Sequence, residues 1–298
     1  MSEVPSVPDP APSAGLRARA DATPPGAVAG GPPIRIAMWS GPRNISTALM
    51  RSWEARGDCA VVDEPFYAHY LQETGLDHPG RAEVLAAQPR DWRVVVASLT
   101  GPVAGGRPIQ YQKQMAHHLL PMIDRGWLMD ELPDGSHVVS CFLVRDPAAM
   151  LVSLGRVLDR PLLEDTGLPQ QVELFDRIRE RTGIAPPVID ARDVLDDPAG
   201  TLSALCRRLG VPWTERMLSW PAGRRETDGV WAPYWYEAVE RSTGFERRDP
   251  RGEPVPPALE RLLGTCRDFH DVLAEHAIRP RASMPAAAEG SLDAAASE

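Results

Sequence analysis

Residues 34–49 read IRIAMWSGPRNISTAL and contain a strand, a turn and the start of a helix. The apolar run Ile34–Ser40 predicts a buried strand, and the Gly-Pro pair after it predicts a tight turn. Across Asn44–Arg56 the apolar side chains recur at helical spacing, which predicts an amphipathic helix. A strand that leads directly into a helix is the repeating unit of α/β proteins, so this stretch indicates an α/β domain.

The rest of the chain repeats this alternation of short apolar runs and amphipathic stretches. Strands joined by helices predict crossover connections and hence a parallel sheet. The predicted fold is therefore three-layer α/β/α with a central, mainly parallel sheet. Further strands are predicted at Cys59–Asp63, Trp92–Leu99, Ile109–Lys113, His137–Val144 and Pro187–Asp190, and further helices at Ala148–Leu158, Gln170–Arg181, Asp197–Leu209 and Pro257–Glu275.

The chain of 298 residues is long enough for one large domain or two small ones. Residues 34–280 contain no long linker, so a single domain is predicted there. Residues 1–33 are rich in Pro, Ala, Gly and Ser, and residues 281–298 are rich in Ala. Both segments have few large apolar residues and are predicted to be disordered.

Composition excludes several classes of partner and compartment. The sequence has no apolar run of about 18 residues, as a membrane helix needs, and its first 30 residues lack the apolar core of a secretory signal. Its four cysteines are widely spaced, which argues against a zinc site or disulfide scaffold and favours the reducing cytoplasm. The formal net charge of −9 argues against nucleic acid or anionic membrane as a partner, so an anionic ligand would need a focused site.

The basic residues are unevenly divided. Of 32, 31 are arginine and one, Lys113, is lysine. Arginine and lysine are nearly interchangeable on a solvated surface, but not where a compact point charge is needed. Lys113 therefore either has a chemical role or is an accident of codon drift, and the count alone favours neither.

The turn after the first strand has the features of an anion site. Backbone N–H groups and the dipole at a helix N-terminus attract anions, Arg43 adds a positive charge, and Ser46 and Thr47 add hydroxyl donors. This combination suits a phosphate or sulfuryl group. The alternative is an ordinary turn capped by Asn44 or Ser46. The loop lacks the second Gly and the Lys of a Walker A motif, and no acidic magnesium partner follows a strand, so no metal is expected.

A second anion site is predicted where the strand His137–Val144 ends. Arg145 leaves the carboxyl end of that strand, which faces the ligand crevice of an open α/β sheet. Pro147 suits the first turn of a helix, and Ser153 follows about two turns later. Arg145 and Ser153 are expected to hold a second phosphate jointly. Taken alone, these residues are explained better by a surface salt bridge for Arg145 and a packing role for Ser153.

The two elements together resemble the sulfotransferases that use 3′-phosphoadenosine 5′-phosphosulfate (PAPS). The Pro-Arg-x-x-Ser-Thr loop matches the family's 5′-phosphosulfate loop, and Arg-x-Pro with Ser153 matches its 3′-phosphate element. The resemblance spans roughly residues 34–275, implies a P-loop-like sulfotransferase fold, and points to a bacterial small-molecule or carbohydrate-like branch, where Arg is typical at position 43. It implies that PAPS is bound by Gly41, Pro42, Arg43, Asn44, Ile45, Ser46, Thr47, Arg145 and Ser153.

Sulfuryl transfer requires a base for the acceptor and cations that stabilise the developing charge. Glu64 follows the second strand and matches the Glu-Pro motif whose Glu is the base in carbohydrate-type sulfotransferases. Its alternatives are a cap for a helix beginning at Pro65, or an ion pair with Arg43. Lys113 ends its strand at the same sheet edge and is expected to neutralise charge on the bridging oxygen of the donor.

His117, next to His118, is the second candidate for the base, because many cytosolic sulfotransferases use a His from a comparable strand. The alternative for both histidines is an exposed position at a helix N-terminus. The aromatic segment Trp231–Tyr236 is either an apolar wall or lid of the site or a loop packed against the core. Arg224 and Arg225 precede it, and the sequence does not indicate which of them contacts the nucleotide.

The sequence therefore predicts a cytoplasmic enzyme that transfers a sulfuryl group from PAPS to a hydroxyl or amine of a small-molecule or glycan-like acceptor. One alternative is a P-loop-type kinase or phosphotransferase with a degenerate loop, which would need magnesium ligands. Another is a nucleotide-binding module that keeps the fold without the chemistry.

Overall fold

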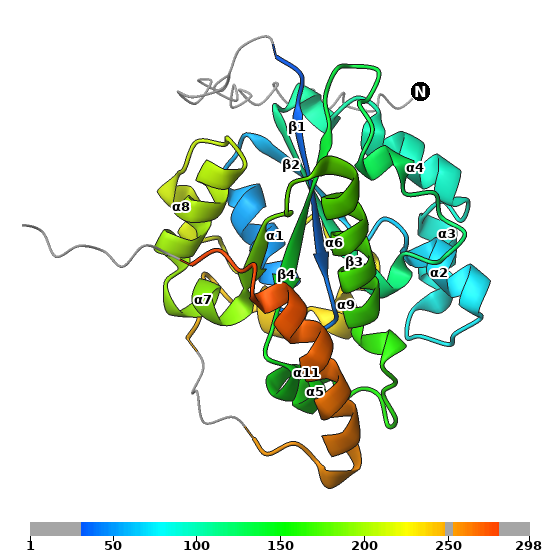
Figure 1. Ribbon diagram of the computed structural model, residues 1–298. Coiled ribbons are helices and arrows are strands. Elements are labelled where there is room, and N and C mark those ends of the chain that lie inside the picture. The colour runs from blue at the N-terminus through cyan, green and yellow to red at the C-terminus, as the bar shows by residue number, and fades with distance from the viewer. Residues whose placement is uncertain (1–30, 248–252, 280–298) are drawn as a thin grey trace, which may run out of the picture.

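The computed structural model of the protein describes residues 31–247 and 253–279. Its central sheet has five strands in the order β2-β3-β1-β4-β5, and every neighbouring pair is parallel. Figure 1 shows helices packed around this sheet, and the predicted α/β fold with a parallel sheet is confirmed. The segments predicted to be disordered, 1–33 and 281–298, lie outside the described residues except for positions 31–33.

The strands are β1 (Ile34–Ser40), β2 (Cys59–Asp63), β3 (Ile109–Met115), β4 (Val138–Val144) and β5 (Val188–Asp190). The helices are α1 (Ser46–Ala55), α2 (Tyr67–Thr74), α3 (Arg81–Ala87), α4 (Trp92–Thr100), α5 (Pro147–Leu154), α6 (Leu168–Thr182), α7 (Ala191–Asp196), α8 (Pro198–Arg208), α9 (Ala232–Trp235), α10 (Glu237–Glu240) and α11 (Glu260–Ala274). Short 3₁₀ turns include η2 (Ala116–His118) and η4 (Glu164–Thr166). Every predicted helix is present, and every predicted strand except one.

The exception is Trp92–Leu99, which we predicted as a strand and which forms helix α4. Its run of β-branched residues favours a strand, but Asp91 caps the helix by accepting a hydrogen bond from the Arg93 backbone N–H at 2.9 Å. Within the helix, Val95 and Leu99 are buried four residues apart on one face. The cap and this packing outweigh the intrinsic preference for strand, which is a weak and context-dependent signal.

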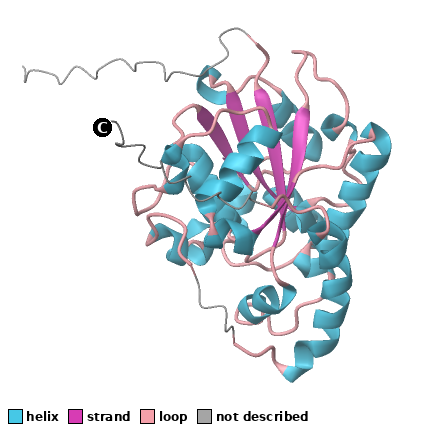
Figure 2. Cartoon of the chain, turned by 60° about the vertical axis from the view of Figure 1, so that its left-hand side comes forward, coloured by secondary structure: helices cyan, strands magenta, loops and turns pink. Residues whose placement is uncertain are grey.

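Alternate residues of β1 belong to two separate cores. Ile36 and Met38 pack in one cluster with residues of α1 and α8, whereas Ala37 and Trp39 pack in another with residues of α4, α6 and α11. Figure 2 shows helices on either side of the strands. Because both faces of the sheet are buried, β1 and β4 are mostly apolar in sequence, whereas β3 alternates apolar residues with buried polar ones.

The position of β1 determines where a ligand can bind. It lies next to β4 in the sheet, and the chain runs from β1 toward β2 on one side but from β4 toward β5 on the other, so the connections after these two neighbouring strands lead in opposite directions. In open α/β sheets such a switch of direction leaves a crevice outside the carboxyl ends of the strands. The loops after β1, β2, β3 and β4 therefore meet at one edge, and these loops carry the predicted site residues.

Among the helices of residues 31–247 and 253–279, none combines the length and the apolar character needed to cross a membrane.

Candidate functional site

A cavity of about 400 Å³ opens at the carboxyl edge of the sheet, within the size range of ligand-binding clefts. Its walls come from the loops after β1 to β4, from α5, and from residues between 235 and 246. Of the twelve site residues predicted from the sequence, Gly41 does not line the cavity. The other eleven do: Pro42, Arg43, Asn44, Ile45, Ser46, Thr47, Glu64, Lys113, His117, Arg145 and Ser153.

Gly41 has a different part in the site. A Cβ atom added at this position would collide with the backbone carbonyl oxygen of Thr166. The absence of a side chain therefore lets η4 approach the turn after β1. Gly41 supports the loop through this close backbone packing, and the residues after it face the cavity.

The loop after β1 has an unusual backbone. Arg43 and Ile45 have φ values of 62° and 57°, in the left-handed region that non-glycine residues seldom adopt. Alternation of left-handed and right-handed residues turns successive N–H groups toward one point and forms an anion-binding concavity. No side chain caps α1 within the described part of the chain. Asn44 instead directs its Nδ2 atom to the carbonyl oxygen of Leu143 at 3.4 Å, so the alternative of an ordinary capped turn does not hold.

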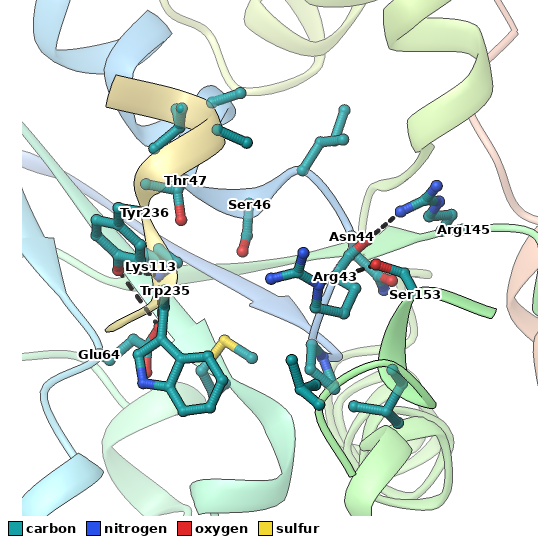
Figure 3. Close-up of a pocket in the computed structure, with 18 of the residues that line it drawn as sticks. Arg43, Asn44, Ser46, Thr47, Glu64, Lys113, Arg145, Ser153, Trp235 and Tyr236 are labelled. Atoms are coloured by element: carbon teal, nitrogen blue, oxygen red, sulfur yellow. Dashed lines mark hydrogen bonds and ion pairs between the residues drawn. The ribbon is translucent and has the colours of Figure 1, made fainter. Parts of the chain in front are cut away.

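The two predicted anion elements touch each other. The Nε atom of Arg43 donates to Oγ of Ser153 at 3.0 Å, and a guanidinium nitrogen of Arg145 donates to the Arg43 carbonyl oxygen. Residues of the loop after β1 and of the segment after β4 thus lie side by side, as Figure 3 shows. This proximity means that one ligand can reach both elements.

The opposite side of the cavity holds a buried ionic network around Lys113 (Figure 3). Its Nζ atom lies 3.0 Å from Asp63 Oδ1, 2.5 Å from Glu64 Oε1 and 2.6 Å from the Tyr236 hydroxyl. The hydroxyl of Tyr236 in turn donates to Asp63 Oδ2 at 2.7 Å and accepts from Trp231 Nε1 at 3.0 Å. A lysine ammonium has three donors, so all three are used within this network.

Burial and charge shift the ionisation of this network in opposite directions. Desolvation disfavours the charged ammonium of Lys113, but the Asp63 and Glu64 carboxylates outweigh it and raise its pKa. Burial raises the pKa of Glu64, and the Lys113 cation opposes this shift. Burial beside the two carboxylates also raises the pKa of Tyr236 well above its ordinary value, which keeps it a hydrogen-bond donor. Lys113 is thus held charged, and Glu64 is made more basic.

Glu64 meets several requirements of a base. Its φ of 40° is the third positive value among the described non-glycine residues, and all three residues line the cavity. Strained backbone of this kind concentrates at functional sites. Its bonds to Lys113 and Tyr236 go to Oε1, so they leave Oε2 for another partner. No side chain caps α2 in the described part of the chain, and the ion pair that Glu64 forms is with Lys113.

The two histidines form η2 and are not exposed at a helix N-terminus. His118 is 2% exposed, and both line the cavity. Desolvation lowers the pKa of His117 to about 3 and holds that of His118 well below its ordinary value. An imidazole with such a low pKa is a weak proton acceptor near neutral pH, which favours Glu64 over His117 as the base.

The segment Trp231–Tyr236 combines both alternatives that the sequence left open. Trp231 is buried, Trp235 and the largely buried Tyr236 line the cavity, and the side chain of Tyr234 is 47% exposed. Neither Arg224 nor Arg225 lines the cavity. The Arg225 guanidinium instead lies 3.7 Å from Glu54 and donates to the Pro221 carbonyl oxygen.

Sequence reasoning did not connect Asp63 or Tyr236 with Lys113, whose network they complete. Asp63 could have been suspected, because it precedes Glu64 at the end of a strand. Nothing in the local sequence pairs Tyr236 with Lys113, because 123 positions separate them. Within the ranges that the structure describes, no group of three or more His, Cys, Asp or Glu side chains is arranged to hold a metal ion.

Comparison with known proteins identifies the family to which this chain belongs. Residues 34–276 match a family model described as a sulfotransferase domain. Two Arabidopsis thaliana relatives, named branched-chain-amino-acid aminotransferase-like proteins 2 and 1, are 34% and 35% identical over 242 and 244 residues. These matches cover 81% and 82% of this chain but only 41% and 42% of the relatives. The chain therefore spans about two fifths of the length of the curated relatives it matches.

Solved structures similar to this chain include the sulfotransferase domain from the curacin biosynthetic pathway, at 17% identity and a TM-score of 0.43, with 80% of this chain and 98% of that one covered. The sulfotransferase domain of the Synechococcus PCC 7002 olefin synthase has 17% identity and a TM-score of 0.45, with coverage of 79% and 94%. A sulfotransferase from Alicyclobacillus acidocaldarius has 14% identity and a TM-score of 0.44, with coverage of 82% and 97%.

Proposed function

Because the chain belongs to the sulfotransferase domain family, we propose that it transfers a sulfuryl group from PAPS to a hydroxyl or amine of a small-molecule or glycan-like acceptor. The observation that carries this proposal is the contact between Arg43 and Ser153, 3.0 Å from Nε to Oγ. It joins two cationic elements from different strands in one cavity. A ligand with anionic groups at two ends fits this arrangement, and a ligand with one anionic group uses only half of it.

The donor would lie across the carboxyl edge of the sheet. Its 5′-phosphosulfate would bind the backbone N–H groups between Arg43 and Thr47, with the Ser46 and Thr47 hydroxyls as further donors. Its 3′-phosphate would bind Arg145 and Ser153, since an arginine fork matches the geometry of a phosphate. The left-handed backbone at Arg43 supports this assignment because it orients the N–H groups before the ligand arrives.

Transfer would proceed by in-line displacement at sulfur. A bond forms between the acceptor oxygen and sulfur, and the bond between sulfur and the bridging oxygen breaks. The leaving group is 3′-phosphoadenosine 5′-phosphate (PAP), and the acceptor proton goes to Glu64. The raised pKa of Glu64 suits it to this step, because a base is most effective when its pKa approaches the working pH.

The contacts of Lys113 change the role expected for it. Its three donors are used by Asp63, Glu64 and Tyr236, so it can reach the bridging oxygen only by releasing one of them. We therefore assign Lys113 to holding Glu64 in place and balancing the two carboxylates. Arg43, from the loop after β1, would supply the positive charge next to the donor.

Nucleotide binding tests this function. We expect PAP to bind much more tightly than AMP, because AMP lacks the group that Arg145 and Ser153 would hold. Each hydrogen bond to that charged group is worth about 1.5–3 kcal/mol, so even one such bond raises the affinity for PAP over that for AMP roughly tenfold or more. Isothermal titration calorimetry with PAP, AMP and ATP measures the difference. Equal affinity for PAP and AMP contradicts the proposal, and preference for ATP with magnesium points to the kinase alternative.

Removal of the Arg145 guanidinium should reduce the difference in affinity between the two nucleotides. We expect Arg145→Ala to lower the affinity for PAP by roughly 10²-fold, because two charged hydrogen bonds are lost, and to leave the affinity for AMP nearly unchanged. Ser153→Ala should act in the same direction but more weakly. Arg156→Ala is the matched control, because Arg156 follows α5 and pairs with Glu253 outside the cavity. If both nucleotides weaken equally in Arg145→Ala, Arg145 has a structural role only.

A further inference from the structure

The charges around the cavity are not evenly distributed. Arg43 and Arg145 lie at the end assigned to the donor. The positive charge of Lys113 is already offset by the two carboxylates that contact it. The cavity wall also includes Asp77 and Asp165, and Asp165 Oδ2 accepts a hydrogen bond from the Leu162 backbone N–H at 2.8 Å. The part of the cavity that Asp77 and Asp165 line therefore carries negative charge.

This acidic region is lined by aromatic rings. The ring of His118 stacks on both Tyr67 and Tyr70 of α2, with centroid distances of 4.8 Å to Tyr67 and 4.6 Å to Tyr70. His117 contacts Tyr70 edge-on at 5.3 Å, and the Tyr67 hydroxyl lies 2.9 Å from Nδ1 of His78. The faces of aromatic rings carry partial negative charge, so such a wall attracts cations as well as flat apolar groups.

The wall also has unsatisfied hydrogen-bonding atoms. Within the described structure, the buried Nδ1 atoms of His117 and His118 have no hydrogen-bond partner. Both imidazoles are held neutral, because burial lowers their pKa values. The two rings therefore line the cavity as neutral aromatic groups beside Tyr67 and Tyr70.

Asp165 and Glu64 both line the cavity together with Tyr67 and Tyr70. Burial raises the pKa of Tyr70 to about 12, and the nearby Asp165 carboxylate adds to this shift. Burial also raises the pKa of Tyr67, and there Glu64 is the neighbouring carboxylate that contributes. Tyr67 and Tyr70 are one turn apart on α2. The two rings thus stand near two different carboxylates, Tyr67 near Glu64 and Tyr70 near Asp165.

We propose that the acceptor is an alcohol or phenol that also carries a protonated amine, with its hydroxyl toward Glu64 and its ammonium group between the Tyr67–Tyr70 wall and the carboxylates of Asp77 and Asp165. This inference rests on the proposed function, because it identifies the acceptor of that same reaction. An acceptor with a carboxylate or sulfate in place of the amine would meet Asp77 and Asp165 with like charge. The same negative group would also be repelled by the multiply anionic donor.

Three phenols that differ only in their tail test the proposal: tyramine, with an ammonium group; tyrosol, with a neutral hydroxyl; and 4-hydroxyphenylacetate, with a carboxylate. Sulfation of each is followed with PAPS as the donor. We expect kcat/KM to be about tenfold higher or more for tyramine than for tyrosol, because a hydrogen bond to a charged group is worth roughly that much. The value for 4-hydroxyphenylacetate should be the lowest of the three. A kcat/KM for tyrosol equal to that for tyramine, or a higher value for 4-hydroxyphenylacetate, overturns the proposal.

Variants identify the carboxylates responsible. Asp77→Asn and Asp165→Asn should each reduce the preference for tyramine over tyrosol and leave PAP affinity unchanged. Asp268→Asn is the matched control, because Asp268 is exposed on α11 and outside the cavity, and it should keep the full preference. An undiminished preference in the Asp77→Asn, Asp165→Asn double variant would show that the acidic region does not select the acceptor.

Calorimetry separates failure of this inference from failure of the proposed function. If the chain does not bind PAP, the proposed function fails, and the acceptor assignment fails with it. If PAP binds but no phenol is sulfated, tyramine binding to the PAP complex is compared with tyrosol binding. Tighter binding of tyramine supports the acceptor class, and equal or weaker binding rejects that class while leaving the sulfotransferase proposal standing.

Discussion

We expect Glu64→Gln to lower the turnover of sulfuryl transfer by roughly 10²- to 10⁴-fold, the usual loss when a general base is removed. The amide oxygen of Gln can still accept the hydrogen bond from Lys113, which is 2.5 Å long in the native chain. The network and the fold should therefore persist, and only the ability to accept a proton is lost. PAP affinity should barely change, because a carboxylate does not attract a phosphate. Single-turnover assays with PAPS and calorimetry with PAP measure the two effects.

Two further variants make this result specific. Glu73→Gln carries the same chemical change on the exposed side of α2, outside the cavity, and should keep full turnover. His117→Ala tests the second candidate for the base. A fully active Glu64→Gln variant together with an inactive His117→Ala variant would assign the role of base to His117. That result would be unexpected, because the lowered pKa of His117 makes it a weak proton acceptor.

We expect Lys113→Ala to destabilise the fold by about 3–5 kcal/mol, because it leaves a buried pair of carboxylates without their cation. The side chains of Lys113 and Asp63 are only 1% and 2% exposed, so water cannot replace the lost ammonium group without rearrangement. Lys113→Arg should not restore stability fully, since a planar guanidinium is bulkier than the ammonium group and spreads its charge. Turnover should fall in both variants, because Glu64 loses its partner. Urea unfolding followed by circular dichroism measures stability.

Two variants show whether charge causes the loss. In the Lys113→Ala background, Asp63→Asn removes one of the uncompensated carboxylates and should recover part of the stability. Gln114→Ala removes a buried but uncharged side chain from the same strand and should cost less, about 1–3 kcal/mol. A Lys113→Arg variant with native stability and turnover would mean that the single lysine among 31 arginines is an accident of codon drift.

The elements that the sequence predicted well depend on local signals. The apolar run Ile34–Ser40 and the turn with Gly41 predict β1 and the anion loop, because neighbouring residues form both. The stretch Trp92–Leu99 shows the limit of such signals. Its β-branched residues favour a strand, whereas burial of Val95 and Leu99 against the core favours the helix that forms. Local preference and tertiary packing disagree there, and packing is the stronger effect.

The candidate site divides in the same way. The sequence alone places Arg43, Glu64, Lys113 and Arg145 at carboxyl ends of parallel strands, and parallel pairing brings these ends to one edge whatever the loops do. Only the tertiary structure pairs Arg43 with Ser153 across 110 positions, and Lys113 with Tyr236 across 123. Contacts between distant segments depend on how loops without a periodic pattern pack over the sheet. The network that turns Lys113 from a candidate ligand contact into the partner of Glu64 is therefore a product of the folded chain.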